Sequence, residues 1–269
     1  MKVSVVVPTY NQARYLAGCL DSLWFQDHAD LEIIVVNDGS TDNTAEVLER
    51  YQWHVMSDQA SYASFYHPGH DVLERVAHRR YPAKGRDLKI IAHPRNRGLA
   101  AALNAGFKAS TGAACTYVPS DDWCMPGMLS ALDQALAGTP ADFAYADMLI
   151  VNDRFEVVRR FDLPEYSFKR CFADWYLCGD AKLYRRELHE RHGFYDESLL
   201  AHDHDLFLRF ALGGARFTHV PRALFAKRDH AGGREVDIHA PSNWTRLIGE
   251  SKQLVLQARA RLEEQGETQ

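Results

Sequence analysis

The sequence lacks any apolar run long enough to cross a membrane. A spanning helix needs about 20 consecutive apolar residues, and the N-terminal run VSVVV is much shorter, as are the others. This run is also too short for the apolar segment of a secretory signal peptide. We therefore expect a cytoplasmic protein without a transmembrane segment, and a peripheral contact with the inner membrane surface stays open.

Cysteine is scarce, and positive charge is not in excess. The five cysteines are odd in number and have no CxxC spacing, which argues against a disulfide framework and against a zinc site. We expect buried, reduced thiols. The net charge of -5 does not suit a general nucleic-acid-binding protein, which presents a basic face. An anionic ligand must therefore be met by a local group of residues, and self-association stays open.

Glycine-rich nucleotide motifs are also missing. The segment after the first apolar run reads PTYNQARY. It has no GxGxxG, which argues against an NAD-dependent dehydrogenase. It also has no glycine-rich loop with basic residues, which argues against a sugar-phosphate nucleotidyltransferase.

Apolar runs and amphipathic segments alternate along the first half of the chain. The runs predict strands at residues 3–7, 33–36, 88–92 and 114–118. Apolar residues at helical spacing predict a helix capped by Asn11, a short helix opened by Thr41 or Asn43, and a helix over 99–110. This order predicts an α/β fold with a doubly wound, mostly parallel central sheet, helices on both faces, and a ligand crevice beyond the carboxyl ends of the strands.

Polar residues follow each of these four strands. They are Thr9, Tyr10 and Asn11, then Asp38, then Asn96, Arg97 and Gly98, and finally Asp121 and Asp122. A nucleotide could lie across this edge, with Tyr10 stacked on a base, Asp38 accepting from a base N–H, and Asp121 binding a divalent cation that neutralises a diphosphate. Taken singly, these residues are as well explained as turn, cap or solvated surface groups; their convergence favours the site.

Five ordered motifs resemble the GT-A glycosyltransferases of family 2. They are VSVVVPTYNQARYLAGCLDSL, EIIVVNDGSTDNT, NRGLAAALNAGFKASTG, YVPSDDWCMPG and HGFYDESLLAHDHDLFLRF. The resemblance implies a nucleotide-diphosphate-sugar donor, most often a UDP-sugar, with Mn²⁺ or Mg²⁺ as cofactor. It implies transfer with inversion to a hydroxyl of a glycan, a glycolipid or another acceptor, in a setting such as polysaccharide biosynthesis.

The resemblance also carries roles onto individual residues. The nucleotide-binding residues would be Pro8, Thr9, Tyr10, Asn11, Asp38, Asn96, Gly98, Ser120 and Asp121. Asp121 and His230 would be metal ligands, with Lys227 and Arg228 as phosphate partners, although a histidine in a loop can also be simply exposed. Two positions depart from the family pattern: Pro119 stands where the first Asp of the acidic motif is usual, and Leu103 stands where many relatives carry Arg.

The motif AHDHDLFLR carries the predicted catalytic base. By resemblance Asp203 removes the proton of the acceptor hydroxyl, and His202 occupies the usual Glu position. Asp205 is expected to cap a helix over 206–212, and both Asp residues could instead be caps without chemistry. Contacts with donor or acceptor are predicted for Asp122, Trp175, Asp180 and His202, while Trp175 suits core packing equally.

The chain is predicted to form one GT-A domain over 1–269. Residues 1–125 would be the nucleotide-sugar half and 126–240 the smaller acceptor and catalytic half, with short strands at 143–146, 149–151 and 157–160. A helical tail would span 241–269. The insertion 51–86 is too long for a plain connection and predicts a lid, an acceptor-binding arm or an oligomer contact. Because of Pro119 and Leu103, a degenerate transferase that binds without turnover is the alternative.

Overall fold

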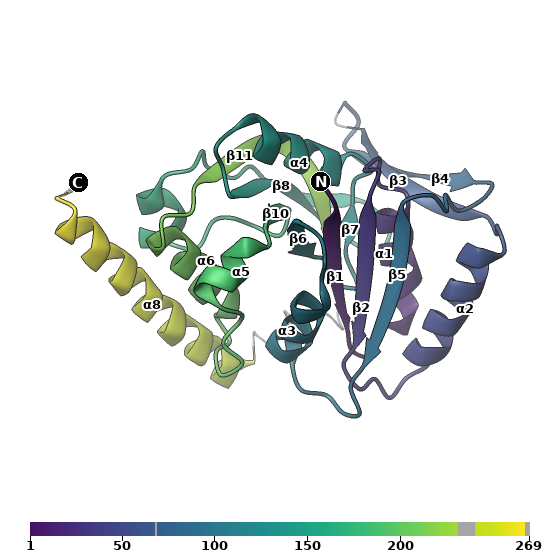
Figure 1. Ribbon diagram of the computed structural model, residues 1–269, viewed down its shortest axis with the longest axis horizontal. Coiled ribbons are helices and arrows are strands. Elements are labelled where there is room, and N and C mark those ends of the chain that lie inside the picture. The colour runs from purple at the N-terminus through teal and green to yellow at the C-terminus, as the bar shows by residue number, and fades with distance from the viewer. Residues whose placement is uncertain (68, 231–239, 267–269) are drawn as a thin grey trace.

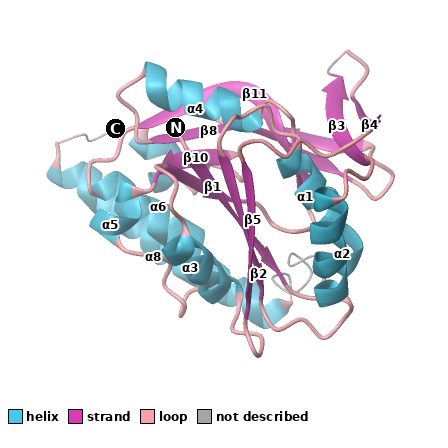
Figure 2. Cartoon of the chain, turned by 45° about the vertical axis from the view of Figure 1, so that its right-hand side comes forward, coloured by secondary structure: helices cyan, strands magenta, loops and turns pink. Residues whose placement is uncertain are grey.

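The computed structural model describes residues 1–67, 69–230 and 240–266, which form a curled sheet covered by helices on both faces (Figures 1 and 2). The strands follow the order β5-β2-β1-β6-β10-β8-β11-β7, with β9 paired to β8. None of the helices in these residues is both long and apolar enough to cross a membrane. All five cysteines are buried free thiols, as expected.

The first half is the predicted parallel α/β unit. Its strands are β1 (Val3–Thr9), β2 (Leu31–Asn37), β5 (Arg86–Ala92) and β6 (Ala114–Tyr117), connected by helices α1 (Ala13–Trp24), α2 (Thr44–Met56) and α3 (Leu99–Ala109). All of these strand pairs are parallel. The register aligns Thr9 with Asn37 and Asn37 with Ala92. The residues that follow these strands therefore emerge at one edge of the sheet.

The second half extends the sheet mainly with antiparallel strands. They are β7 (Trp123–Cys124), β8 (Phe143–Val151), β9 (Val157–Phe161), β10 (Lys182–Arg185) and β11 (Phe217–Arg228), with α4 (Met128–Gly138), a π-helical turn (Lys169–Ala173), α5 (Glu187–His192), α6 (His202–Leu212) and α8 (Pro241–Glu264). The two short strands predicted at 143–146 and 149–151 are one strand. Asp147 is buried within it and accepts from His219 Nε2 at 2.8 Å. A single buried acid therefore interrupted the apolar pattern without interrupting the strand.

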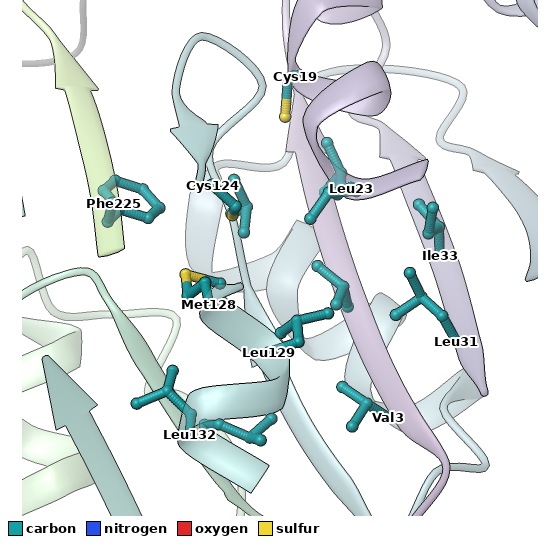
Figure 3. Packing of buried hydrophobic residues seen from close by; sticks show 14 of the residues in the cluster. Val3, Cys19, Leu23, Leu31, Ile33, Cys124, Met128, Leu129, Leu132 and Phe225 are labelled. Carbon is teal, nitrogen blue, oxygen red and sulfur yellow. The ribbon is translucent and has the colours of Figure 1, made fainter. Parts of the chain in front are cut away.

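Alternation along the central strands separates two cores. Val3, Val5 and Val7 of β1 pack with α1 and α4, whereas Val6 packs with α3 and the helices of the second half. Figure 3 shows the first core, in which Leu23 of α1, Leu129 of α4 and Val3 of β1 belong to one cluster. Both faces of β1 are therefore buried, which explains its continuous apolar run.

The insertion folds as a hairpin of β3 (Ser61–His67) and β4 (Val72–His78). It begins later than predicted because α2 continues to Met56, with Tyr51 buried beneath it. The hydroxyls of Tyr51 and Tyr81 both donate to Asp21 Oδ1, at 2.9 and 2.8 Å, and burial raises the pKa of Asp21. This buried acid fixes the segment around the hairpin to α1. The lid, arm and oligomer roles remain predictions.

Two predicted helix caps are wrong, and a third is confirmed in position only. Asn11 has a left-handed φ of 53° and precedes the cap position of α1; the backbone N–H of Ala13 instead donates to the Asp42 carboxylate. Asn43, one of the two predicted openers of α2, occupies its N-cap position without a side-chain cap bond, and Asp42 accepts from Thr44 N at 3.0 Å. Asp205 lies inside α6, which begins at His202, and is paired with Arg209 at 2.8 Å.

Glu32 lies at the end of the sheet opposite to the carboxyl ends of the parallel strands, and its buried charge can be tested through the pH dependence of stability. Its fully buried carboxylate accepts from Ser4 Oγ at 2.6 Å and Thr111 N at 2.9 Å and is paired with Lys89. Burial raises its pKa, but these donors outweigh burial and lower it from 4.5 to about 2. A group with a lowered folded-state pKa stabilises above its unfolded pKa, and that stability is lost as pH falls toward 2.

We expect Glu32→Gln to lower the free energy of unfolding by about 2 kcal/mol at pH 7, since buried donors lose a charged acceptor. Urea titrations at pH 7, 4.5 and 3 measure it. The gap between wild type and variant should narrow as pH falls. An equal gap at all three pH values would contradict the assignment.

Candidate active site

One cavity of about 580 Å³ lies at the carboxyl ends of the parallel strands. It is lined by fifteen of the predicted site residues: Pro8, Thr9, Tyr10, Asn11, Asp38, Asn96, Gly98, Ser120, Asp121, Asp122, Asp180, Asp203, Lys227, Arg228 and His230. These come from seven different strand ends, turns and helix starts. The fold therefore brings together residues that are as much as 222 positions apart in the sequence.

The loops that follow β1 and β2 form one wall of the cavity. Asn11 Oδ1 accepts from Thr41 N at 2.7 Å, and Asn11 N donates to Ser40 Oγ at 3.0 Å. Gly39 has φ +69°, and a Cβ there would lie 2.3 Å from the backbone carbon of Arg95. Only glycine permits so close an approach between the loops after β2 and β5.

Asp38 holds the next loop in place. Its buried carboxylate accepts from His93 Nδ1 at 2.6 Å, Gly98 N at 2.8 Å and Arg97 N at 3.1 Å. Much of its hydrogen-bonding capacity is therefore used by the protein itself. Asp38 lines the cavity as predicted, and its first role is to shape the loop that carries Asn96 and Gly98.

The acidic motif forms a tight turn after β6. Asp122 N donates to Pro119 O at 3.1 Å, which closes the turn, and Asp121 Oδ2 lies 3.0 Å from His230 Nε2. The His230 side chain is 2% exposed and its ring lies 4.5 Å from that of Tyr15. A proline at position 119 is therefore compatible with the turn, and the predicted pair of Asp121 and His230 is in contact. The glycines at 232 and 233, which follow His230 in the sequence, lie outside the described residues.

Asp122 differs from its neighbour by being buried. Its Oδ1 accepts from Arg228 N at 2.8 Å. Burial, followed by the charges of Asp121 and Asp180, raises the pKa of Asp122 well above its usual value. Lys227 Nζ lies 3.7 Å from Asp180 Oδ2 on the same side of the cavity. The buried Asp122 carboxyl therefore favours its proton, and Lys227 of β11 lines the same cavity.

Arg228 has a structural position that the sequence did not indicate. Its guanidinium lies 3.8 Å over the Trp123 ring, donates to Asp153 Oδ1 at 2.8 Å, and donates through Nε to Asp121 O at 3.1 Å. Phe155, with φ 63°, packs 4.9 Å from Trp123. The phosphate contact by Arg228 remains a prediction. The structure shows instead that Arg228 binds the acidic turn through the carbonyl oxygen of Asp121.

Asp203 lies in the first turn of α6 and accepts from Tyr117 Oη at 2.6 Å. Tyr117 ends β6 and also lines the cavity. Both residues are therefore held by regular elements. A carboxylate at a helix N-terminus is in addition favoured by the helix dipole.

Two predicted contact residues are absent from the lining formed by the described residues. His202 is 2% exposed, and its Nδ1 faces Leu199 O at 3.3 Å while its ring meets Tyr195. Trp175 is 41% exposed and lies beside His204, with 6.4 Å between ring centroids. Direct contact of His202 with donor or acceptor is therefore not supported, because its side chain packs into the α6 start.

The sequence reasoning missed three residues near the site. Tyr117 reads as an ordinary strand residue, no strand was predicted around Lys182, and His93 had no motif around it. Lys182 is buried, with Nζ 4.3 Å from the centroid of the Tyr117 ring. Lys182 opens the mixed strand KLYR, which also carries Arg185, so the local sequence did not indicate that this lysine is buried.

A divalent cation has partial support from the residues present. Within residues 1–67, 69–230 and 240–266, no three His, Cys, Asp or Glu side chains are arranged to hold a metal ion. Asp121 and His230 nevertheless face each other within 3.0 Å, and a carboxylate with an imidazole suits Mn²⁺. This pair fits a divalent cation and would contribute two of its ligands.

The family model of glycosyl transferase family 2 matches residues 4–62 and 70–193. The chain belongs to this family. The chain has the mixed α/β GT-A fold that the sequence motifs predicted. Asp203, Lys227 and His230 lie beyond the matched residues, so their roles depend on the geometry of the cavity.

Relatives and solved structures agree with this assignment. The chain is 30% identical over 203 residues to the uncharacterized glycosyltransferase EpsJ of Bacillus subtilis, covering 70% of this chain and 49% of the relative. It is 28% identical over 234 residues to the PGL/p-HBAD biosynthesis glycosyltransferase of Mycobacterium bovis, covering 86% and 77%. The chain spans 17% to 57% of the length of several curated relatives that it matches.

Two solved structures share the fold. TarS 1–349 of S. aureus, in complex with UDP-GlcNAc, superposes with a TM-score of 0.69 at 22% identity over 96% of this chain and 66% of that one. The mannosyltransferase PcManGT of Pyrobaculum calidifontis, with GDP-Man and Mn²⁺, gives 0.64 at 19% identity over 97% and 69%. At these identities the likeness concerns the fold alone.

Proposed function

We propose that this protein binds a nucleoside diphosphate sugar in the 580 Å³ cavity and transfers the sugar to an acceptor hydroxyl with inversion. Its sequence motifs favour a UDP-sugar as the donor. The observation that carries the proposal is that one cavity joins the loops after β1, β2 and β5 to both Asp121 and Asp203. Its volume suits a ligand of nucleotide-sugar size.

The loops after β1, β2 and β5 would bind the nucleoside. Tyr10 is 41% exposed at the rim and offers a ring face to a base. The Thr9 hydroxyl is buried at the wall and has no hydrogen-bond partner among the described residues. A buried polar group of this kind points to a partner outside the chain, and we assign the base and ribose to this end of the cavity.

The diphosphate would lie between the acidic turn and the start of the late loop. A bound Mn²⁺ or Mg²⁺ would neutralise the diphosphate and stabilise the leaving group. Asp121 and His230 would hold it, and Lys227 would supply positive charge to the phosphates. Arg228 would keep the turn in place through its bonds to Asp121 O and Asp153.

Asp203 would act as general base toward the acceptor. In an inverting displacement the acceptor hydroxyl attacks the anomeric carbon opposite the departing diphosphate, and its proton passes to a carboxylate within hydrogen-bond reach. Asp203 lines the same cavity as the acidic turn and accepts a hydrogen bond from Tyr117. The start of α6 and the end of β6 therefore hold its carboxylate in place.

Calorimetric titration with UDP, GDP, CDP and dTDP, each with and without Mn²⁺, tests the donor assignment. We expect one diphosphate to bind at least about tenfold more tightly than the others, because the base pocket is formed by fixed loops. We expect its affinity to fall by about tenfold or more without the cation.

Failure of all four to bind would contradict the proposal. Binding without transfer or donor hydrolysis in the presence of candidate acceptors would favour the degenerate transferase. NMR of the product anomer tests inversion.

A further inference from the structure

Tyr117 connects Asp203 to a buried lysine on the neighbouring strand. The Tyr117 hydroxyl donates to Asp203 Oδ2 at 2.6 Å. The ammonium of Lys182, on β10, lies 4.3 Å from the centroid of the same ring and 5.4 Å from that of Phe207. Three residues from β6, β10 and α6 therefore form one continuous contact from the core to the cavity.

Lys182 is an unusual residue for its place. Its side chain is 1% exposed, and Nζ donates to Gly179 O at 3.1 Å and lies 3.8 Å from Asp180 Oδ1. Burying an ammonium costs free energy that such partners offset only in part. An apolar residue would fill the same strand position at a lower cost in free energy. Packing therefore does not explain why this position carries a charge.

We propose that Tyr117 and Lys182 are positioning residues for the transfer reaction: Tyr117 fixes and orients the Asp203 carboxylate, and Lys182 acts on Asp203 through the Tyr117 ring. The inference rests on the proposed role of Asp203 as general base. Neither residue is assigned this role by the motifs of the chain.

Two physical effects support this arrangement. A hydrogen bond to one carboxylate oxygen fixes the side chain, so the other oxygen keeps a constant position relative to the cavity. A cation at the face of a phenol ring is attracted to the ring and draws electron density from it, which makes the hydroxyl a better donor. Lys182 should therefore matter only while the Tyr117 hydroxyl is present.

The main test is Tyr117→Phe, which removes one oxygen atom and keeps the ring. We expect kcat to fall on the order of 10–50-fold. A general base accelerates a reaction by about 10²–10⁴-fold, and a base whose side chain is no longer fixed retains part of that acceleration. Donor KM and nucleotide Kd should stay within about twofold. Tyr145→Phe is the matched control, because Tyr145 is also a buried tyrosine but donates to Pro164 O; its kcat should be unchanged.

The role of Lys182 is tested by coupling. Lys182→Met should lower kcat by roughly 3–10-fold, and the double variant with Tyr117→Phe should have the kcat of Tyr117→Phe alone, since the lysine acts through the hydroxyl. Thermal unfolding of each variant separates loss of fold from loss of orientation.

Several outcomes would overturn the inference. Full kcat in Tyr117→Phe would remove Tyr117 from the reaction, and multiplied losses in the double variant would show that Lys182 acts independently. A large rise in donor KM would assign Tyr117 to donor binding. Unimpaired turnover in Asp203→Asn would instead refute the proposed base, which is a separate result.

Discussion

Asp203→Asn is expected to lower kcat by roughly 10³-fold, because an amide cannot accept the acceptor proton and general-base catalysis contributes 10²–10⁴-fold. The amide still accepts the hydrogen bond from Tyr117, so the start of α6 should stay in place. Nucleotide affinity should therefore change by less than about twofold. Initial rates with saturating donor, together with calorimetric Kd values, measure the two quantities separately.

Asp205→Asn is the matched control for this variant. Asp205 is two residues further along the same helix, and its carboxylate is paired with Arg209 rather than directed into the cavity. The control should keep its kcat and lose only some stability. Equal turnover in Asp203→Asn and the wild type would remove Asp203 from the mechanism and leave its contact with Tyr117 as a structural bond.

Asp121→Asn has the second largest expected effect. A cation that neutralises a leaving diphosphate is worth several kcal/mol, and each 1.36 kcal/mol is a factor of ten in rate. We expect kcat/KM to fall roughly 10²–10³-fold. The loss should include weaker nucleotide binding, in contrast to Asp203→Asn, because Asp121 would hold the cation that bridges to the phosphates.

Removal of the cation provides the comparison for Asp121→Asn. Wild-type protein treated with EDTA should approach the variant in both nucleotide Kd and rate. Added Mn²⁺ should restore both quantities in the wild type but not in the variant. Titration of Mn²⁺ followed by electron paramagnetic resonance measures the site directly. Equal Mn²⁺ affinity in the variant and the wild type would exclude Asp121 as a ligand.

The parts of the molecule that local patterns determine were predictable. The strands of the first half follow from continuous apolar runs, which both faces of the sheet require. Since those strands are parallel, the residues after them had to meet at one edge, and the structure places Tyr10, Asp38 and Asp121 around one cavity. The β-α order therefore predicted the fold and the gathering of these residues at one edge, while their roles stay predictions.

The missed features depend on partners that are distant in sequence. Asp147 reads as the end of a strand until His219 is placed beside it. Asp205 reads as a cap until the helix is seen to begin three residues earlier. Tyr117 and Asp203 are 86 residues apart, and neither sequence context indicates the other. Periodicity gives each element its buried face but does not say which side chains meet across elements.

The inserted hairpin and the acidic turn share one small core. Leu73 of β4 packs in the same cluster as Trp123, and Arg75 lies 5.3 Å over the Phe155 ring that contacts Trp123. Arg228 stacks on Trp123 and holds the carbonyl of Asp121. A substitution that repacks Leu73 is therefore expected to disturb the packing beneath the acidic turn, although none of the described hairpin residues lines the cavity.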